Sequence, residues 1–470
     1  MKITRLQAQK VHGYLPLDVE FFEDLTFLTG LNGTGKTSAL RLLMALLTPN
    51  LDELGSIAFE SATVTVHDST SDVVVHAVKT IDAVTLSISS QKQKLEITSS
   101  DLELYMDVRR RDEPRSPIIE KFQQHIVFQA IKAISTPMFL GLDRRFFPPG
   151  VTNEEISEAR RREFLARRYW AEDPSARGTP VTALAEVNYL VISKMQEIRA
   201  SQEQLDERLR AEFFTKAFEY KPSDLIGKPA RLPSRQEIER YRQQLVNIER
   251  AAENVKIPVP EIQTALTHFF ERMSLVVESM EKSAQSRPAA RKSTKKTGNK
   301  PEQGQFIPDK DYFEWIINKP QADRILEHLR LLDEYILNRD SLRDPITRFL
   351  SLVNGFLVQT RKVVSVASTG QLNVKISGSD DPRQITALSS GERQLLVMLA
   401  HLSLNPNLAG SGVFIVDEPE LSLHIDWQEK FVDAIREANP KVQLILATHS
   451  PAIILDRDDA CRTLSGVANA

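Results

Sequence analysis

The sequence predicts an α/β fold that also contains an antiparallel β subdomain and a large helical insertion. An apolar strand pattern at residues 25–29 leads through a glycine-rich segment into a helix pattern at residues 36–47. Alternating residues between 61 and 100, separated by turn residues, indicate an antiparallel meander. Helix-forming residues with charged faces dominate residues 152–285. Together these patterns predict a helical part inserted between two α/β halves.

Residues 1–150 are expected to form the N-terminal half, which includes the β subdomain. The predicted helix at 36–47 has an apolar face made by Leu40, Leu42, Leu43, Leu46 and Leu47. The meander is expected to use strands at 61–68, 72–80, 83–90 and 94–100. A helical segment near 117–133 and a strand that runs into a Pro-Pro-Gly turn at 148–150 complete this half.

Residues 151–345 are expected to form an arm-like helical insertion. The helix patterns within 152–285 have patchy apolar spacing and are broken by Pro and Gly, so separate helices are predicted instead of a long uninterrupted coiled coil. Two or three more helices are expected between 309 and 360. Residues 346–470 are expected to form the C-terminal half, in which two strand patterns at 362–368 and 371–377 follow the last of these helices.

A basic segment at 284–306 interrupts the predicted insertion. It contains six Lys or Arg residues before its first acidic residue, Glu302, and has almost no apolar side chain with which to fold. The main interpretation is a disordered, solvated loop. The alternative is a flexible arm that binds DNA, RNA or an acidic protein surface.

Composition narrows the classes of protein that this chain can belong to. The net charge is −3, with 60 basic and 63 acidic residues, so no global field demands a nucleic-acid or membrane partner. The single cysteine, Cys461, excludes an internal disulfide framework and a zinc site built from paired thiolates. No apolar run is long enough to cross a bilayer, and the N-terminus does not resemble a signal peptide. A soluble cytoplasmic protein with no membrane partner is therefore expected.

The segment "GLNGTGKT" at 30–37 matches the phosphate-binding loop pattern in full. It stands between a strand and an amphipathic helix, where its glycines let backbone amides point at phosphate oxygens and the helix N-terminus adds positive potential. Lys36 is expected to reach the β- and γ-phosphates of ATP, and the Thr37 hydroxyl to ligate Mg²⁺. The expected ATP-binding residues are Gly30, Asn32, Gly33, Thr34, Gly35, Lys36, Thr37 and Ser38.

Two further strands end in polar residues that suit phosphate chemistry. The segment "GVFIVDEPE" at 412–420 predicts a buried strand followed by Asp417, placed to hold Mg²⁺ through water, and Glu418, placed to polarise the attacking water. The segment "QLILATHS" at 443–450 predicts a buried strand that ends near His449. Its position favours a γ-phosphate sensor, and the alternative is a purely structural histidine.

The segment "TALSSGERQLLVMLA" at 386–400 predicts a helix with an unusual start. Ser389 is a candidate N-cap, and Glu392, three residues on, completes a capping box.

These motifs, in this order, resemble the ABC-type ATPases, the superfamily that includes SMC, RecF-like and OLD-like proteins. The resemblance implies a P-loop NTPase head of ABC type and identifies "LSSGE" as the signature, "ELSLH" at 420–424 as the D-loop and His449 as the switch histidine. In that family the signature of one subunit closes over ATP bound to another. The resemblance therefore implies that Ser389, Ser390, Gly391 and Glu392 act in trans in an ATP-sandwich dimer, and that dimers assemble further, for example to a hexamer.

Spacing separates branches of that superfamily. The long segment between Lys36 and Ser389 differs from the compact insertion of a transporter subunit, and the broken helices and single cysteine differ from SMC and zinc-hook proteins. Few residues follow His449, so any nuclease is expected to be a separate protein. The chain most resembles the ATPase subunits of bacterial anti-phage systems such as PARIS and Septu.

The resemblance leads to one main hypothesis of function and two alternatives. In the main hypothesis the chain hydrolyses ATP, oligomerises, and holds or activates a separate nuclease effector, with a phage protein as trigger. The alternatives are a RecF-like repair or replication ATPase that clamps DNA, and a scaffold that binds ATP but turns it over very slowly. Binding to DNA that weakens steeply as salt rises would favour the RecF-like alternative.

Overall fold

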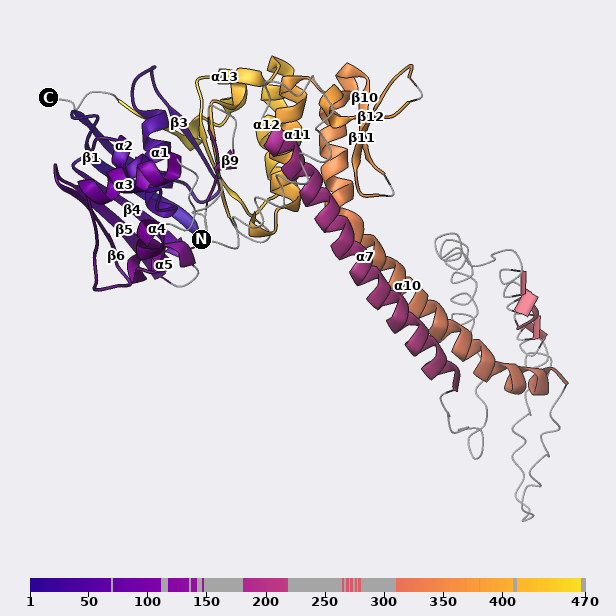
Figure 1. Ribbon diagram of the computed structural model, residues 1–470. Coiled ribbons are helices and arrows are strands. Elements are labelled where there is room, and N and C mark those ends of the chain that lie inside the picture. The colour runs from indigo at the N-terminus through magenta and orange to yellow at the C-terminus, as the bar shows by residue number, and fades with distance from the viewer. Residues whose placement is uncertain are drawn as a thin grey trace, which may run out of the picture. The chain divides into compact units, whose positions relative to one another are not determined.

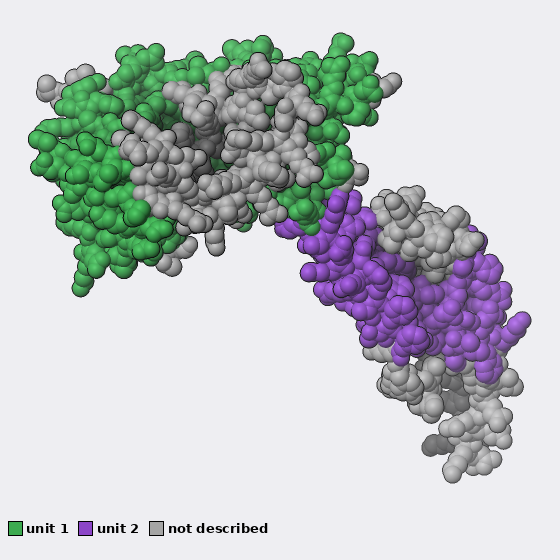
Figure 2. All heavy atoms as spheres, viewed as in Figure 1, with its two compact units in different colours: residues 1–196, 345–470 green, residues 197–344 purple. Residues whose placement is uncertain are grey.

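The fold is taken from a computed structural model of the chain. It describes residues 1–68, 71–110, 117–134, 137–141, 146–147, 181–218, 310–367, 369–379, 381–408 and 412–465, together with short stretches between 264 and 279. The described chain divides into two compact units, shown in different colours in Figure 2. Unit 1 comprises residues 1–196 and 345–470, and unit 2 comprises residues 197–344. The expected division into three parts at 150 and 345 stays a prediction.

Unit 1 is organised around a six-stranded, mostly parallel sheet (Figure 1). In spatial order its strands are β15 (Cys461–Thr463), β3 (Leu25–Thr29), β14 (Gln443–Ala447), β13 (Val413–Asp417), β8 (Met138–Leu140) and β9 (Phe146–Phe147). The first five pair in parallel, and β9 pairs antiparallel with β8. Because the three strands that precede the predicted phosphate loop, the Asp-Glu pair and His449 are neighbours, their carboxyl ends meet at one edge.

The second sheet of unit 1 is antiparallel and confirms the predicted meander. Its order is β2 (Leu15–Glu20), β1 (Lys2–Val11), β4 (Ser61–Asp68), β5 (Ser71–Lys79), β6 (Ala83–Ile88) and β7 (Leu95–Thr98). Strand β1 pairs with β2 on one side and β4 on the other, so the start of the chain joins the meander. Buried and partly buried residues alternate along β4 and β6, because one face of the sheet packs on the core.

Helix α1 (Lys36–Leu47) lies between the two sheets and contacts β1, β4 and β5 as well as β13. All five leucines of its predicted apolar face are at most 1% exposed. Gln443 also joins the sheets, since its side chain accepts a hydrogen bond from Ile3 N and donates to Ile3 O, each at 2.7 Å. Short helices α2 (Leu51–Ser56), α3 (Ser99–Arg110), α4 (Pro117–Gln123) and α5 (Ile126–Ala133) complete this region.

The C-terminal half of unit 1 also contains a small sheet and three helices. The sheet contains β10 (Lys362–Val366), β11 (Leu372–Ile376) and β12 (Arg383–Gln384) in that order. The helices are α11 (Ser390–Leu404), α12 (Ile425–Ala438) and α13 (Pro451–Ile454). A short 3-10 turn at Pro419–Ser422 directly follows β13 and leads towards α12.

Two long helices run through the predicted insertion, α7 (Val181–Phe218) and α10 (Lys310–Leu357). Within unit 2 the pair is antiparallel: Tyr335 Oη donates to Asp206 Oδ1 at 2.6 Å, the His328 ring stacks on Phe213, and Lys216 pairs with Glu327. Positions along α7 rise as their partners along α10 fall, and Figure 1 shows the two helices side by side.

This pair corrects the prediction of two or three helices between 309 and 360. Pro320 and Pro345, which suggest breaks in the sequence, both lie inside the single helix α10. Proline removes one backbone donor and strains the preceding turn. The contacts of α10 with α7 lie at residues 327–335, between the two prolines, and a local pattern does not reveal them.

Several expectations lie outside the described residues. They include the basic segment at 284–306, the Pro-Pro-Gly turn at 148–150 and the helix patterns at 154–170 and 234–255. Among the helices of the described chain, none is long and apolar enough to cross a membrane.

Candidate nucleotide-binding site

The predicted phosphate loop connects β3 to α1, as the motif requires. Gly30, Gly33 and Gly35 have φ values of 139°, 84° and 91°, which residues with side chains rarely adopt. A Cβ atom on Gly30 would lie 2.6 Å from Leu464 O, and one on Gly35 would lie 2.4 Å from Leu15 Cδ2. Backbone conformation therefore requires glycine at both ends of the loop, and at Gly30 the close Leu464 carbonyl requires it as well.

Lys36, the first residue of α1, extends its side chain into this loop. It is only 6% exposed, and its Nζ donates to Gly30 O at 3.0 Å and Leu31 O at 3.2 Å. Burial lowers the pKa of Lys36, and the carboxylates of Glu418 and Asp417 oppose that shift. The loop therefore holds a buried cation beside two acids.

The other side chains of the loop differ in where they point. Asn32 is exposed, whereas the Thr34 hydroxyl donates to Leu31 O at 2.9 Å. Ser38 Oγ lies 2.8 Å from His12 Nε2, which comes from the turn between β1 and β2. That turn has strained backbone, since His12 has a φ of 55°. The resemblance to ABC-type ATPases makes His12 or Tyr14 a candidate nucleotide contact, because many relatives carry an Asn-Phe-Arg segment where this chain has "KVHGY" at 10–14, and that role stays a prediction.

Asp417 ends β13 and is 4% exposed. Neither carboxylate oxygen has a hydrogen-bond partner of ordinary length within the described chain. Burial is the main cause that raises the pKa of Asp417, while the nearby Thr37 hydroxyl and the Lys36 ammonium act in the opposite direction. A buried carboxylate with unused acceptors beside a hydroxyl is a donor set that fits a hard divalent cation such as Mg²⁺.

Glu418 follows Asp417 and turns the chain sharply, with a φ of 49° and a ψ of 61°. Its N–H donates to Ala447 O at 2.8 Å, which extends the pairing of β13 with β14. Its Oε1 lies 3.9 Å from His449 Nε2. The structure thus brings together the two residues that the sequence predicts to be catalytic, and both side chains are partly exposed.

The helix that begins near Ser390 has the predicted capping box. Ser389 is the N-cap: its Oγ accepts from Glu392 N at 3.4 Å, and Glu392 Oε2 accepts from Ser389 N at 2.6 Å. Lys362 Nζ also donates to Glu392 Oε2, at 2.7 Å. Burial favours a raised pKa for Glu392, but hydrogen bonds from Lys362 and Ser389 outweigh it and lower the pKa.

The four predicted signature residues therefore differ in how far they are exposed to solvent. Ser389 and Ser390 are exposed, whereas Gly391 and Glu392 are buried. The carboxylate of Glu392 is used inside its own subunit. The two serines are the signature residues that can meet a neighbouring molecule, and the trans role of all four stays a prediction.

Two family profiles match more than half of the chain each. One is described as "AAA domain, putative AbiEii toxin, Type IV TA system" and matches residues 195–456; the other is described as "AAA domain" and matches residues 5–256. The chain belongs to the AAA-domain family. The phosphate loop lies in the second match, and the Asp-Glu pair and His449 lie in the first.

Curated relatives of this AAA-domain chain carry the word ATPase in their names. The chain is 26% identical over 185 residues to "Retron Vc95 probable ATPase" of Vibrio cholerae serotype O1 biovar El Tor. The aligned residues make up 31% of this chain and 36% of that relative. The chain is 33% identical over 78 residues to "Retron Ec83 probable ATPase" of Escherichia coli, which covers 15% of this chain and 14% of the relative. The matches thus span about a third or less of either relative.

Solved structures of Smc head domains are also similar in part. The head domain with an extended coiled coil from Pyrococcus furiosus, bound to the C-terminal domain of ScpA, is 13% identical with a TM-score of 0.37, over 96% of this chain and 91% of that one. The head domain from Thermotoga maritima is 11% identical with a TM-score of 0.34, over 99% and 97%. TM-scores this low give no basis for transferring detail.

Glu420 is a further acid near the site. The resemblance places it only in the D-loop, but its Oε1 accepts hydrogen bonds from Thr448 Oγ1 at 2.9 Å and from His449 N at 2.7 Å. The signal in the sequence is an acid two residues after Glu418. Its partners lie 28 and 29 positions away, so a local motif could not have identified them.

Proposed function

We propose that the chain binds and hydrolyses ATP, and works as an oligomeric subunit of an anti-phage defence system that holds or activates a separate nuclease effector. The observation that carries the proposal is the meeting of Lys36, Asp417 and the Glu418–His449 pair at one edge of the parallel sheet. Phosphoryl transfer needs a cation at the phosphate oxygens, a carboxylate that can hold a metal ion, and an acid that positions the attacking water. Lys36, Asp417 and Glu418 are proposed to supply these three groups.

The residues divide the work of hydrolysis. The amides of the phosphate loop and Lys36 hold the β- and γ-phosphates, which are multiply charged anions. Thr37 and Asp417 hold Mg²⁺, which supplies charge neutralisation on the phosphate oxygens when bound. Glu418 orients the attacking water and accepts its proton, and the His449 imidazole stands beside Glu418 at the γ-phosphate end of the site.

The exposure of the two predicted signature serines supports ATP-dependent association. We infer that Ser389 and Ser390 close over the nucleotide of a second copy, and that the resulting dimers assemble further. Ser390 is the better residue to test, because Ser389 also caps its own helix. Ser390→Arg should leave ATP binding to the single subunit intact and abolish ATP-dependent association, which light scattering with and without ATP measures. Association unchanged by the arginine would contradict the trans role.

The names of two relatives, "Retron Vc95 probable ATPase" and "Retron Ec83 probable ATPase", support the defence context. Since these matches cover only part of each relative, the effector and its trigger remain part of the proposal. We infer a separate nuclease as effector and a phage protein as trigger.

Purification from the native host tests the proposal. The tagged chain should hydrolyse ATP and retain a nuclease at moderate salt, and Glu418→Gln should retain the same partner without hydrolysis. A chain that retains no nuclease, and binds duplex DNA with an affinity that falls steeply as salt rises, would instead show a DNA-clamping ATPase.

A further inference from the structure

Side-chain hydrogen bonds connect the segment that follows β13 to the segment that follows β14. The Glu420 carboxylate accepts from both the Thr448 hydroxyl and the His449 backbone N–H through one oxygen, Oε1. Thr448 is fully buried and its own N–H donates to Leu28 O at 3.2 Å, on β3. Glu420 therefore holds the backbone of His449. The neighbouring Thr448, which also contacts Glu420, is itself hydrogen-bonded to strand β3 of the sheet.

A second side chain holds the same segment from the other direction. Gln428, in the first turn of α12, donates through Nε2 to Leu423 O at 2.8 Å and accepts through Oε1 from the Ser450 hydroxyl at 2.6 Å. Ser450 N in turn donates to Thr448 Oγ1 at 3.0 Å. Residues 448–450 are thus tied at two points to the segment that begins at Glu418.

These hydrogen bonds matter because Glu418 and His449 form no hydrogen bond with each other that would hold the imidazole in place. The 3.9 Å between Glu418 Oε1 and His449 Nε2 is longer than a hydrogen bond. The position of the imidazole must therefore come from its backbone, and the His449 N–H has Glu420 as its acceptor. Glu420 lies two residues after Glu418. One short turn therefore contains both Glu418, proposed to position the attacking water, and Glu420, which holds the backbone of His449.

The second oxygen of Glu420 is also informative. Oε2 is buried and has no hydrogen-bond partner within the described chain. The carboxylate acts at a distance on Lys36 and on Asp417: it adds a small upward push to the pKa of each, which in Lys36 opposes the larger lowering by burial.

We propose that Glu420 is a positioning residue for ATP hydrolysis, which holds the His449 backbone so that the imidazole stays beside Glu418. The inference rests on the proposed ATPase function. Glu420 acts through His449, and its two hydrogen bonds are the means. Nucleotide affinity comes mainly from the phosphate loop, so the loss of Glu420 should change it little.

Steady-state ATP hydrolysis by the full chain tests this role, with Glu420→Ala, Glu420→Gln, His449→Ala and the Glu420→Ala/His449→Ala double variant. Glu420→Ala should lower kcat by about 10- to 100-fold, the usual cost of removing a group that orients a reacting residue, and should change KM for ATP by less than about 3-fold. Glu420→Gln should recover most of kcat, because its amide oxygen can still accept from Thr448 and His449.

The double variant separates positioning from general loss of structure. Because Glu420 acts through His449, the double variant should be slower than His449→Ala by no more than about 2-fold. If Glu420→Ala does not fold, Glu420→Asp takes its place, since it keeps the charge but withdraws the oxygen by about 1.5 Å, one carbon–carbon bond. It should show the same loss of kcat.

Each contrary result has a defined meaning. Wild-type kcat in Glu420→Ala, or losses that multiply in the double variant, would overturn the positioning role. So would a Glu420→Gln variant as slow as Glu420→Ala. A wild-type chain that hydrolyses no ATP would instead refute the proposed function on which the inference rests. Asp18→Asn, on the exposed outer face of β2, is the control and should leave kcat unchanged.

Discussion

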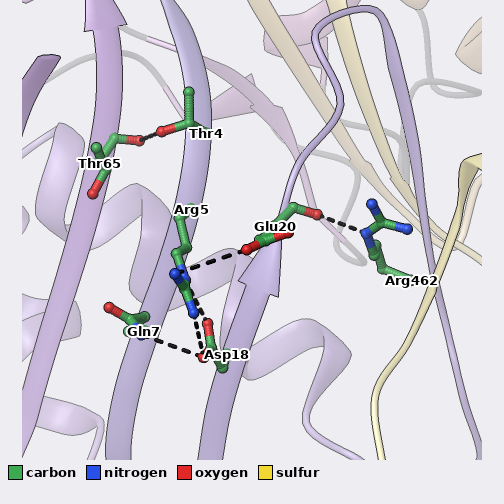
Figure 3. A network of polar contacts seen from close by, with 7 residues as sticks. All are labelled: Thr4, Arg5, Gln7, Asp18, Glu20, Thr65 and Arg462. Carbon is green, nitrogen blue, oxygen red and sulfur yellow. Dashed lines mark hydrogen bonds and ion pairs between the residues drawn. The ribbon is translucent and has the colours of Figure 1, made fainter.

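The outer face of β1 and β2 and the carboxyl edge of the parallel sheet both carry clusters of acidic and basic side chains. On the outer face, Arg5 donates to Asp18 through two nitrogens, at 2.8 and 2.7 Å, and Gln7 donates to the same carboxylate (Figure 3). Arg5 and Asp18 are 42% and 53% exposed. Every acid of this network has a protein partner, and water solvates both charges.

The cluster at the sheet edge has the opposite character. Lys36 and Asp417 are almost fully buried, and the oxygens of Asp417 and one oxygen of Glu420 have no hydrogen-bond partner within the described chain. Burying a carboxylate without a partner costs stability. Paired charges at the surface need no ligand, whereas a bound cation or nucleotide would account for the unpaired buried carboxylates at the sheet edge.

Lys36→Ala should give the largest effect that separates the two clusters. It removes the buried cation of the phosphate loop, so ATP affinity should fall by at least about 100-fold, equal to about 2.7 kcal/mol. Titration with a fluorescent ATP analogue measures the affinity. Arg5→Ala, which removes a cation from the outer network, is the matched control and should leave affinity unchanged. Tight ATP binding by Lys36→Ala would refute the phosphate-loop assignment.

Asp417→Asn should stabilise the nucleotide-free protein while it abolishes Mg²⁺-dependent hydrolysis. Because burial raises the pKa of Asp417 above its value in the unfolded chain, the ionised carboxylate costs stability above the unfolded pKa. That cost disappears as pH falls below both values. The variant should therefore gain about 1 to 3 kcal/mol at neutral pH, and the gain should shrink in acid.

Thermal melts of wild type and Asp417→Asn between acid and neutral pH, without ATP or Mg²⁺, measure this gain. Destabilisation of the variant at neutral pH would mean that the carboxylate has a structural partner in the folded chain.

Asp18→Asn should give the smallest effect. The pair with Arg5 is exposed, so its contribution to stability is small and screened by salt. The melting temperature should fall by no more than about 2 °C, and the loss should decrease in high salt. A large loss that persists in high salt would show that the outer network is structural.

Those parts of the molecule that depend on neighbours in sequence could be predicted. Periodicity identified the apolar face of α1 and the meander, and spacing identified the glycine loop and the Ser389–Glu392 capping box. Each of these involves residues within a few positions of one another, or strands joined by short turns, so the local pattern contains the cause.

The features that could not be predicted depend on distant partners. The continuity of α10 through Pro320 and Pro345 is consistent with its contacts along α7, more than a hundred positions away. Gly30 is required in part by Leu464, at the other end of the chain. The contact of Glu420 with His449 exists only because β13 and β14 are neighbours in the sheet. No local pattern contains these pairings.

The central claim is that the buried cluster is an ATP-hydrolysing site, and Glu418→Gln tests it most directly. The substitution keeps the shape of the side chain but removes the carboxylate that accepts a proton from water. ATP binding should match wild type, hydrolysis should fall by at least about 100-fold, and ATP-bound dimers should accumulate. Hydrolysis by Glu418→Gln at the wild-type rate would contradict the claim.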